Sequence, residues 1–209
     1  MNTLEHCVCS SSLWRYISQR QLLPWVLSDA CLGDHVLEIG AGYGAATVHL
    51  RERVPRVTSL EYDHNSTSKL KANHNGHSGG VLRGDASHLP FANETFSSAI
   101  AILVLHHLKS RKMQDLAFAE VLRVLRPGGT FLAFEINDSW IQHLGHFKST
   151  FTPLSPGSAF ARLTLAGFSR VSVDFRRGGF RLHALRAKPG HASREPEHSP
   201  HRGAVAAGV

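Results

Sequence analysis

Long apolar runs are absent from this 209-residue sequence. Its longest strongly apolar run, at 99–105, is far shorter than the roughly 20 residues that a membrane-spanning helix needs. The N-terminus also lacks the basic flank, apolar run and small-residue cleavage site of a secretory signal. We therefore expect a cytoplasmic protein without a membrane span.

Cysteine is scarce, and the 3 cysteines do not make a disulfide framework. Two of them, in Cys7-Val8-Cys9, stand beside His6, but no second pair of ligands at zinc-like spacing follows. The histidines after Lys188 are not arranged as a metal cluster either. The sequence therefore predicts no metal site.

Acidic residues are outnumbered, with 16 Asp and Glu against 23 Lys and Arg and a formal net charge of +7. A basic protein can bind nucleic acid or another anionic partner. Here the basic residues are scattered, without the interleaved aromatic residues of a single-strand binder. We interpret the charge as a solvated surface and regard nucleic acid as an unfavoured partner.

The segment at 36–44 carries the strongest local signal. Its apolar residues predict a buried strand, and three glycines (Gly40, Gly42 and Gly44) then predict a tight loop before a helix. Glycine permits positive φ and a close approach of the backbone to a ligand. Such a loop lies at the carboxyl end of the first strand of an α/β sheet, where ligands bind. Because a buried carboxylate needs a partner, we expect Glu38 to face the loop and to accept from backbone amides or from a ligand.

The remaining pattern alternates strands with helices. Strands are predicted at 56–63, 80–82, 99–105 and 130–136, helices at 66–73, 113–125 and 158–166, and a final hairpin at 171–175 and 181–186. An uninterrupted apolar strand such as 99–105 belongs in the middle of a parallel sheet. The pattern predicts a Rossmann-like, doubly wound, mostly parallel seven-stranded α/β sheet with a C-terminal antiparallel hairpin.

Three segments are predicted around this sheet. Residues 1–29 form a helical cover segment with two short helices broken near Pro24, which either cover the ligand site or only pack on the sheet. Residues 30–187 form the ligand-binding domain, and 188–209 form a disordered tail. The irregular segment 137–153, rich in aromatic residues and histidine, is expected to contact the substrate.

Acids and histidines follow the predicted strand ends. Glu61 lies 21 residues after Gly40, close to the roughly 20-residue spacing of a carboxylate that holds ribose hydroxyls, although a helix cap is an alternative. The side chain of Asp85 and the amide of Ala86 can read the edge of a base. His106 and His107 are candidate general bases, with packing under the loop and shaping of the pocket as the alternative.

In this order the motifs resemble those of the class I S-adenosylmethionine-dependent methyltransferases, most closely the small-molecule branch that includes the quinone-biosynthesis C-methyltransferases. The resemblance covers about 30–187 and rests on 36–44, Glu61, Gly84-Asp85-Ala86 and the Arg-Pro-Gly-Gly run at 126–129. One position departs from the family: Phe96-Ser97-Ser98 stands where Phe-Asp is usual.

The resemblance implies S-adenosylmethionine as cofactor and methyl transfer to a small-molecule acceptor, with carbon, oxygen and nitrogen left open as the atom methylated. It implies that the glycine loop cradles the methionine part, that Glu61 holds the ribose, and that Asp85 and Ala86 hold the adenine. No metal is required. The predicted catalytic residues are His106 and His107. The predicted cofactor residues are Glu38, Gly40, Ala41, Gly42, Gly44, Glu61, Tyr62, Asp85, Ala86 and Leu103.

Three rival functions remain in view. An NAD-dependent dehydrogenase is compatible with the glycines of 40–45, although Glu38 and the final hairpin argue against it. A domain that has lost catalysis and only binds a cofactor or partner is compatible with the Ser97-Ser98 departure. Nucleic-acid methylation is disfavoured, because 105–108 reads Leu-His-His-Leu instead of the Asn-Pro-Pro-Tyr type of motif.

Overall fold

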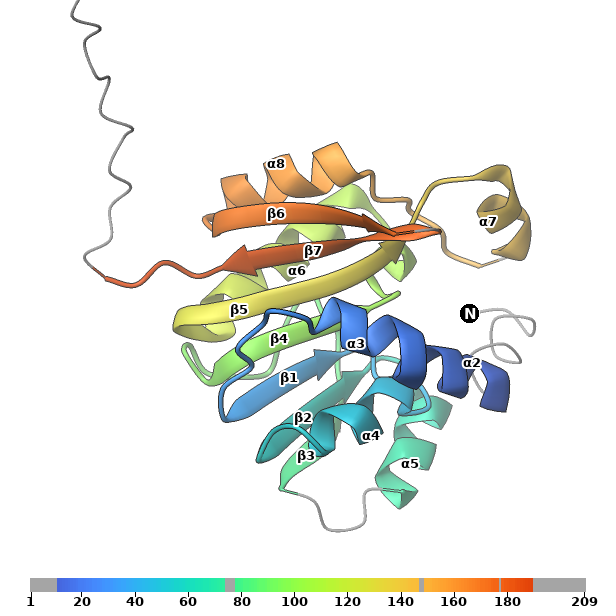
Figure 1. Ribbon diagram of the computed structural model, residues 1–209, viewed down its shortest axis with the longest axis horizontal. Helices are drawn as coiled ribbons and strands as arrows, with labels where there is room; N and C mark the ends of the chain where they lie inside the picture. Colours follow the sequence, from blue (N-terminus) through green and yellow to red (C-terminus); the bar gives the residue numbers. More distant parts are fainter. Residues whose placement is uncertain (1–10, 74–77, 147–148, 177, 190–209) are drawn as a thin grey trace, which may run out of the picture.

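The computed structural model describes residues 11–73, 78–146, 149–176 and 178–189. These form a seven-stranded sheet in the order β3-β2-β1-β4-β5-β7-β6, in which β7 is antiparallel to both of its neighbours and the other pairs are parallel (Figure 1). The strands are β1 His35–Ile39, β2 Arg56–Glu61, β3 Gly79–Arg83, β4 Phe96–Ile102, β5 Leu125–Ile136, β6 Ser169–Arg176 and β7 Gly179–Leu185. The predicted fold class is confirmed.

Helices cover both faces of the sheet. They are α2 Ser12–Ile17, the π-helical turn η1 Ser18–Leu22, α3 Leu23–Val26, α4 Ala45–Arg51, α5 His64–Ala72, the 3-10 turn η2 Leu105–His107, α6 Arg111–Val124, α7 Trp140–Gly145 and α8 Pro156–Ala166. Side chains of a strand alternate between faces, so Leu37 packs in the core under α6 and α8, whereas Val36 packs in the core with α3 and α4. Within the described residues no helix is long and apolar enough to cross a membrane.

The predicted break at Pro24 is wrong. The helical segment runs from Ser12 to Val26, and the π-helical turn Ser18–Leu22 lies directly before the proline. A proline ring clashes with the carbonyl four residues earlier in a regular helix and leaves it without a donor. The wider π turn changes the hydrogen-bond spacing at that point, so the chain accommodates the ring without ending the helix.

This N-terminal helical segment is fixed to the sheet. Leu23 and Val26 are fully buried in the core. Arg181 on β7 donates from Nη1 to the backbone oxygens of Trp25 (3.1 Å) and Ser28 (3.0 Å). The buried side chains and the arginine contacts together hold the segment in one place.

The ends of β4 and of its neighbours differ from the prediction. The strand was expected at 99–105, but β4 ends at Ile102 because Leu103 takes a positive φ of 57°. The strand β5 begins at Leu125 and includes Pro127-Gly128-Gly129, which was expected to separate helix from strand. Part of the segment expected to be irregular is the short helix α7, which begins after Ser139.

Two serines hold the loop before β1 at the position where the sequence departs from the family that it resembles. The hydroxyl of Ser97 accepts from the backbone N–H of His35 (2.9 Å) and lies 2.7 Å from the backbone oxygen of Leu32. The hydroxyl of Ser98 donates to the same Leu32 oxygen (2.6 Å). Short hydroxyl side chains therefore tie this loop to β4, and the departure does not disrupt the first strand.

Helix α6 holds the loop that follows Asp85. Arg123 donates from Nη1 to the backbone oxygen of Phe91 (2.7 Å) and from Nη2 to that of Leu89 (3.0 Å). It also pairs with Glu120 at 2.8 Å, and this hydrogen bond lowers the pKa of the Glu120 carboxyl. Arg123 was not among the predicted site residues, and its contacts with this loop join parts of the chain more than 30 positions apart.

Candidate active site

A cavity of about 420 Å³ lies at the carboxyl ends of the parallel strands. Its wall includes the glycine loop, the residues that follow β2, the Gly84-Asp85-Ala86 turn and the end of β4. In Figure 1, α2 and α7 lie beyond this edge of the sheet. All the predicted cofactor residues except Gly44 line the cavity, while Gly44 precedes α4 in the left-handed conformation.

The glycine loop requires glycine for two different reasons. Gly40 has a φ of +68°, and a Cβ there would lie 2.2 Å from a methyl carbon of Val104, so the loop passes too close to the end of β4 for any side chain. Gly42 has a φ of +54°, but a Cβ there would meet nothing within 4 Å. The absence of a side chain at Gly42 keeps space open beside the loop.

Glu38 is fully buried on β1 and borders on the cavity. Its Oε2 accepts from the hydroxyls of Thr47 (2.6 Å) and Ser59 (2.7 Å), which are neither of the two predicted kinds of donor, backbone amides or a ligand. Its Oε1 is buried without a hydrogen-bond partner among the described residues. Burial raises the pKa of this carboxyl to about 7. When this carboxyl is ionised, its Oε1 can accept a hydrogen bond from a ligand that carries a donor or a positive charge.

Glu61 links the end of β2 to the glycine loop. Its Oε2 accepts from the backbone N–H of Gly42 (2.7 Å) and its Oε1 from that of Asp63 (2.8 Å). The helix α5 is capped by Asp63, whose Oδ1 accepts from Ser66 N (2.8 Å). Glu61 is therefore not the helix cap that the alternative interpretation assumed, and it lies on the cavity wall.

Asp85 uses one carboxylate oxygen to shape its own turn. Its Oδ1 accepts from the backbone N–H (2.8 Å) and the hydroxyl (2.7 Å) of Ser87. This is an Asx turn, and it places Asp85 and Ala86 together on the wall. The sequence analysis missed Ser87, although an Asp-x-Ser spacing is a recognisable signal for such a turn.

The two predicted catalytic histidines occupy different positions. His107 lines the cavity, whereas His106 is only 3% exposed and is not part of the wall. Nδ1 of His106 lies 2.5 Å from Oε2 of Glu135, a buried acid on β5. Oε1 of Glu135 accepts from the backbone N–H groups of Val104 (3.0 Å) and Leu105 (2.7 Å). Glu135 was missed, yet an acid inside an apolar strand is the same signal that identified Glu38.

Two segments outside the strand ends complete the wall. Trp14 and Ser18 of the N-terminal helical segment line the cavity, and Gln19 donates to the backbone oxygen of Ala45 (3.3 Å). Thr150, from the segment expected to contact substrate, also lines it. The N-terminal segment thus packs on the sheet and borders on the cavity as well. Residues 1–10 and 190–209 of the predicted cover and tail lie outside the described residues.

Comparison with known proteins shows which family the sequence of this chain matches. The profile of the family described as "Methyltransferase domain" matches residues 37–133, from β1 through most of β5. The chain is also 32% identical over 122 residues to a demethylmenaquinone methyltransferase of Thermobifida fusca. The segment 37–133 therefore belongs to a methyltransferase domain family, and its relatives indicate the class I S-adenosylmethionine-dependent type. In this family S-adenosylmethionine is the methyl donor.

The curated relatives match this chain over part of their length. The Thermobifida fusca alignment covers 56% of this chain and 49% of that protein. A fatty-acid O-methyltransferase of Mycolicibacterium smegmatis is 34% identical over 102 residues, which are 48% of this chain and 36% of that protein. The chain therefore spans about half the length, or less, of these two relatives.

Solved structures show the same fold as this chain. A putative methyltransferase solved in complex with the Trm112 activator of Haloferax volcanii has a TM-score of 0.73 at 16% identity, over 90% of this chain and 99% of that one. A methyltransferase of Methanosarcina mazei has a TM-score of 0.63 at 20% identity, over 79% and 98%. The similarity supports the arrangement of the sheet and its helices.

Three features of the cavity fit the donor of this family. The buried Oε1 of Glu38 lacks a partner among the described residues, the space beside Gly42 is open, and Asp85 forms its turn through only one of its two oxygens. A ligand that carries an amino group, a flexible chain and a hydrogen-bonding base edge matches these features in kind.

Proposed function

We propose that this protein transfers a methyl group from S-adenosylmethionine to a small-molecule acceptor. The observation that carries the proposal is the convergence of Glu38, Glu61 and Asp85 on one cavity around the glycine loop. Two relatives carry names that describe small-molecule methylation, a demethylmenaquinone methyltransferase and a fatty-acid O-methyltransferase. Carbon, oxygen and nitrogen acceptors are all compatible with this proposal.

In this proposal different residues of the cavity bind different parts of the cofactor. The loop at 40–42 and Glu38 hold the methionine part, because an ammonium group would supply the partner that Glu38 Oε1 lacks among the described residues. Glu61 faces the ribose hydroxyls with Tyr62 beside it. The Oδ2 of Asp85 and the amide of Ala86 meet the adenine, with Leu103 completing the wall. Gly44 contributes by starting α4.

The chemistry that the cofactor supplies is an electrophilic methyl group on a sulfonium. The methyl group moves from sulfur to the acceptor, and the sulfur becomes a neutral thioether. The protein contributes by holding the acceptor in line and by excluding water, and such positioning can supply up to roughly 7 to 11 kcal/mol. We place the acceptor beside His107, because this histidine borders on the cavity, and we assign buried His106 to its support.

The test is calorimetric binding of S-adenosylhomocysteine and of NAD. Asp85→Asn keeps an oxygen for the Ser87 turn but replaces Oδ2 with a donor, so we expect it to weaken S-adenosylhomocysteine binding about 10- to 150-fold, the value of a lost charge-assisted hydrogen bond. Asp29→Asn makes the same chemical change at an exposed residue with a φ of 60°, and should leave binding unchanged.

The outcomes separate the rival functions. Binding of NAD in place of S-adenosylhomocysteine would support the dehydrogenase, and binding of neither would refute the proposal. Glu61→Gln gives a second arm, because a neutral amide cannot accept both the Gly42 and Asp63 amides in the same way and holds ribose hydroxyls less strongly. Equal affinities for wild type and both variants would contradict the residue assignment.

A further inference from the structure

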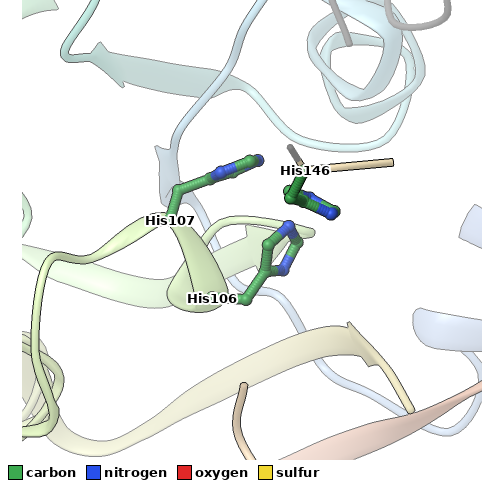
Figure 2. A group of neighbouring side chains, drawn as sticks. All are labelled: His106, His107 and His146. Carbon is green, nitrogen blue, oxygen red and sulfur yellow. The ribbon is translucent and has the colours of Figure 1, made fainter. Parts of the chain in front are cut away.

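Three histidines from two separate parts of the chain meet beside the cavity. His106 and His107 come from the η2 turn, and His146 follows α7. One ring nitrogen of each lies within 4.8 Å of one ring nitrogen of each of the other two. Figure 2 shows the three imidazole rings close to one another. The cluster unites residues 40 positions apart in the sequence, so no local motif could reveal it.

All three rings are oriented by an oxygen acceptor at Nδ1. Nδ1 of His106 lies 2.5 Å from Oε2 of Glu135. Nδ1 of His146 lies 2.7 Å from the backbone oxygen of Gln142, and Nδ1 of His107 lies 3.3 Å from the backbone oxygen of Thr150. A carbonyl or carboxylate oxygen at Nδ1 favours the tautomer with its proton there. Nε2 then carries the lone pair in each ring.

This is the arrangement that metal-binding histidines show in proteins. A histidine ligand donates its other N–H to a carboxylate, a backbone carbonyl or water, which fixes the tautomer and the ring. Here one carboxylate and two backbone carbonyls serve three rings. Phe151 stacks on His146 with ring centroids 4.4 Å apart, and gives the cluster an apolar side. Such surroundings limit the access of water.

We propose that His106, His107 and His146 bind a divalent transition metal of the zinc class and leave one coordination position open toward the cavity. Three neutral imidazoles with an open fourth position are a known composition of catalytic zinc sites. Tetrahedral Zn–N bonds of about 2.0 to 2.1 Å set the nitrogens about 3.3 Å apart. Since no pair of these nitrogens lies more than 4.8 Å apart, the rings need to draw together by at most about 1.5 Å.

The site deepens the proposed methyl transfer, on which this part of the inference rests. His107 and the neighbouring Thr150 border on the cavity, so an acceptor that carries a hydroxyl oxygen can reach the open position. A bound metal ion lowers the pKa of a coordinated oxygen and turns it into a nucleophile near neutral pH. The acceptor proton leaves to solvent when the oxygen binds the metal, and the oxygen then takes the methyl group. His107 acts in this scheme as a metal ligand and not as the general base.

The experiment uses Co²⁺ as the probe, because four-coordinate Co²⁺ absorbs strongly in the visible range. Metal-free wild type should bind one equivalent with this spectrum and release it to excess Zn²⁺. His146→Ala should lose the signal. His143→Ala is the matched control: it removes another histidine of α7, which pairs with Asp138 at 2.8 Å, and should keep the signal. Glu135→Gln should weaken metal binding about 10- to 100-fold.

Each outcome decides one statement. A wild type that gives only the spectrum of aqueous Co²⁺, or a His143→Ala signal as weak as that of His146→Ala, overturns the metal site. Acetohydroxamate should shift the Co²⁺ spectrum, and an unchanged spectrum refutes the open position. The affinity of the metal-free proteins for S-adenosylhomocysteine is measured as well. A variant that still binds S-adenosylhomocysteine is folded. A wild type that does not bind it would refute the proposed methyl transfer, while the Co²⁺ spectrum would still decide the metal site.

Discussion

The buried carboxyl of Glu38 makes the stability of the ligand-free protein depend on pH in an unusual direction. Its folded pKa is about 7, raised above the ordinary value of 4.5 mainly by burial. Between these values the unfolded carboxyl is ionised while the folded one keeps its proton, so the folded state binds more protons. Stability from this group must therefore fall as pH rises from about 4.5 to about 7.

The magnitude follows from the difference between the folded and unfolded pKa values. A tenfold change in a proton-binding constant corresponds to about 1.4 kcal/mol, and the linkage between pH 5 and pH 8 amounts to about 2 to 3 kcal/mol. Glu38→Gln removes the ionisation and keeps an oxygen that can accept from the Thr47 and Ser59 hydroxyls. We expect the variant to gain about 2 to 3 kcal/mol relative to wild type when both are taken from pH 5 to pH 8.

The assay is urea unfolding of wild type and Glu38→Gln at several pH values between 5 and 8, without ligand. Burial lowers the pKa of His35, His49 and His183, so each adds stability as pH rises through 6.5. These opposite contributions are the same in both proteins and cancel in the comparison. The variant Asp29→Asn removes an exposed carboxyl, and as the control it should follow wild type. Parallel pH profiles for wild type and Glu38→Gln would refute the reasoning.

Three further predictions follow from contacts on the cavity wall. Gly40→Ala should unfold with about 1 to 3 kcal/mol less free energy than Gly42→Ala, because only its Cβ meets a side chain, at 2.2 Å; equal urea midpoints would contradict this. Arg123→Ala should lose about 1 to 2 kcal/mol of unfolding free energy, reduced by the partial exposure of its pair with Glu120; an unchanged midpoint would show the loop to be held otherwise. S-adenosylhomocysteine should release a proton on binding at pH 6, seen by calorimetry in buffers of different ionisation enthalpy, and Glu38→Gln should abolish this release.

The sheet could be predicted because its signals are local. Apolar runs indicated every strand of the sheet, and glycines placed the loop after β1. The boundaries were less certain, since the end of β4 depends on the backbone of Leu103, a residue type that rarely adopts positive φ. The break predicted at Pro24 was wrong for a related reason. The rule that proline ends a helix assumes regular α-helical hydrogen bonds, and the π turn earlier in this helix changes their spacing.

Two acidic residues of the cavity could also be predicted from the sequence, but their hydrogen-bond partners could not. The sequence marked Glu38 and Glu61 by their places at strand ends, yet which groups they accept from depends on how α4, β2 and the glycine loop pack. Pairing of His106 with Glu135 joins residues 29 positions apart. His146 enters the cluster only because the chain after α7 returns to η2. Such meetings of distant residues follow from tertiary packing and not from spacing.

Three buried carboxyl side chains lie near the edge of the sheet where the parallel strands end. They differ in how many of their oxygens have hydrogen-bond partners, and this difference indicates where a bound ligand can stabilise the fold most. Glu61 accepts from two backbone amides, and Glu135 from two amides and a histidine, so the cost of burying each is offset within the protein. Glu38 has two hydroxyl partners on one oxygen and, among the described residues, none on the other. Of these three carboxyls, Glu38 is therefore the one whose buried oxygen stays unsatisfied until a donor arrives from the cavity. We therefore propose that occupation of the cavity and ionisation of this carboxyl are a single coupled equilibrium.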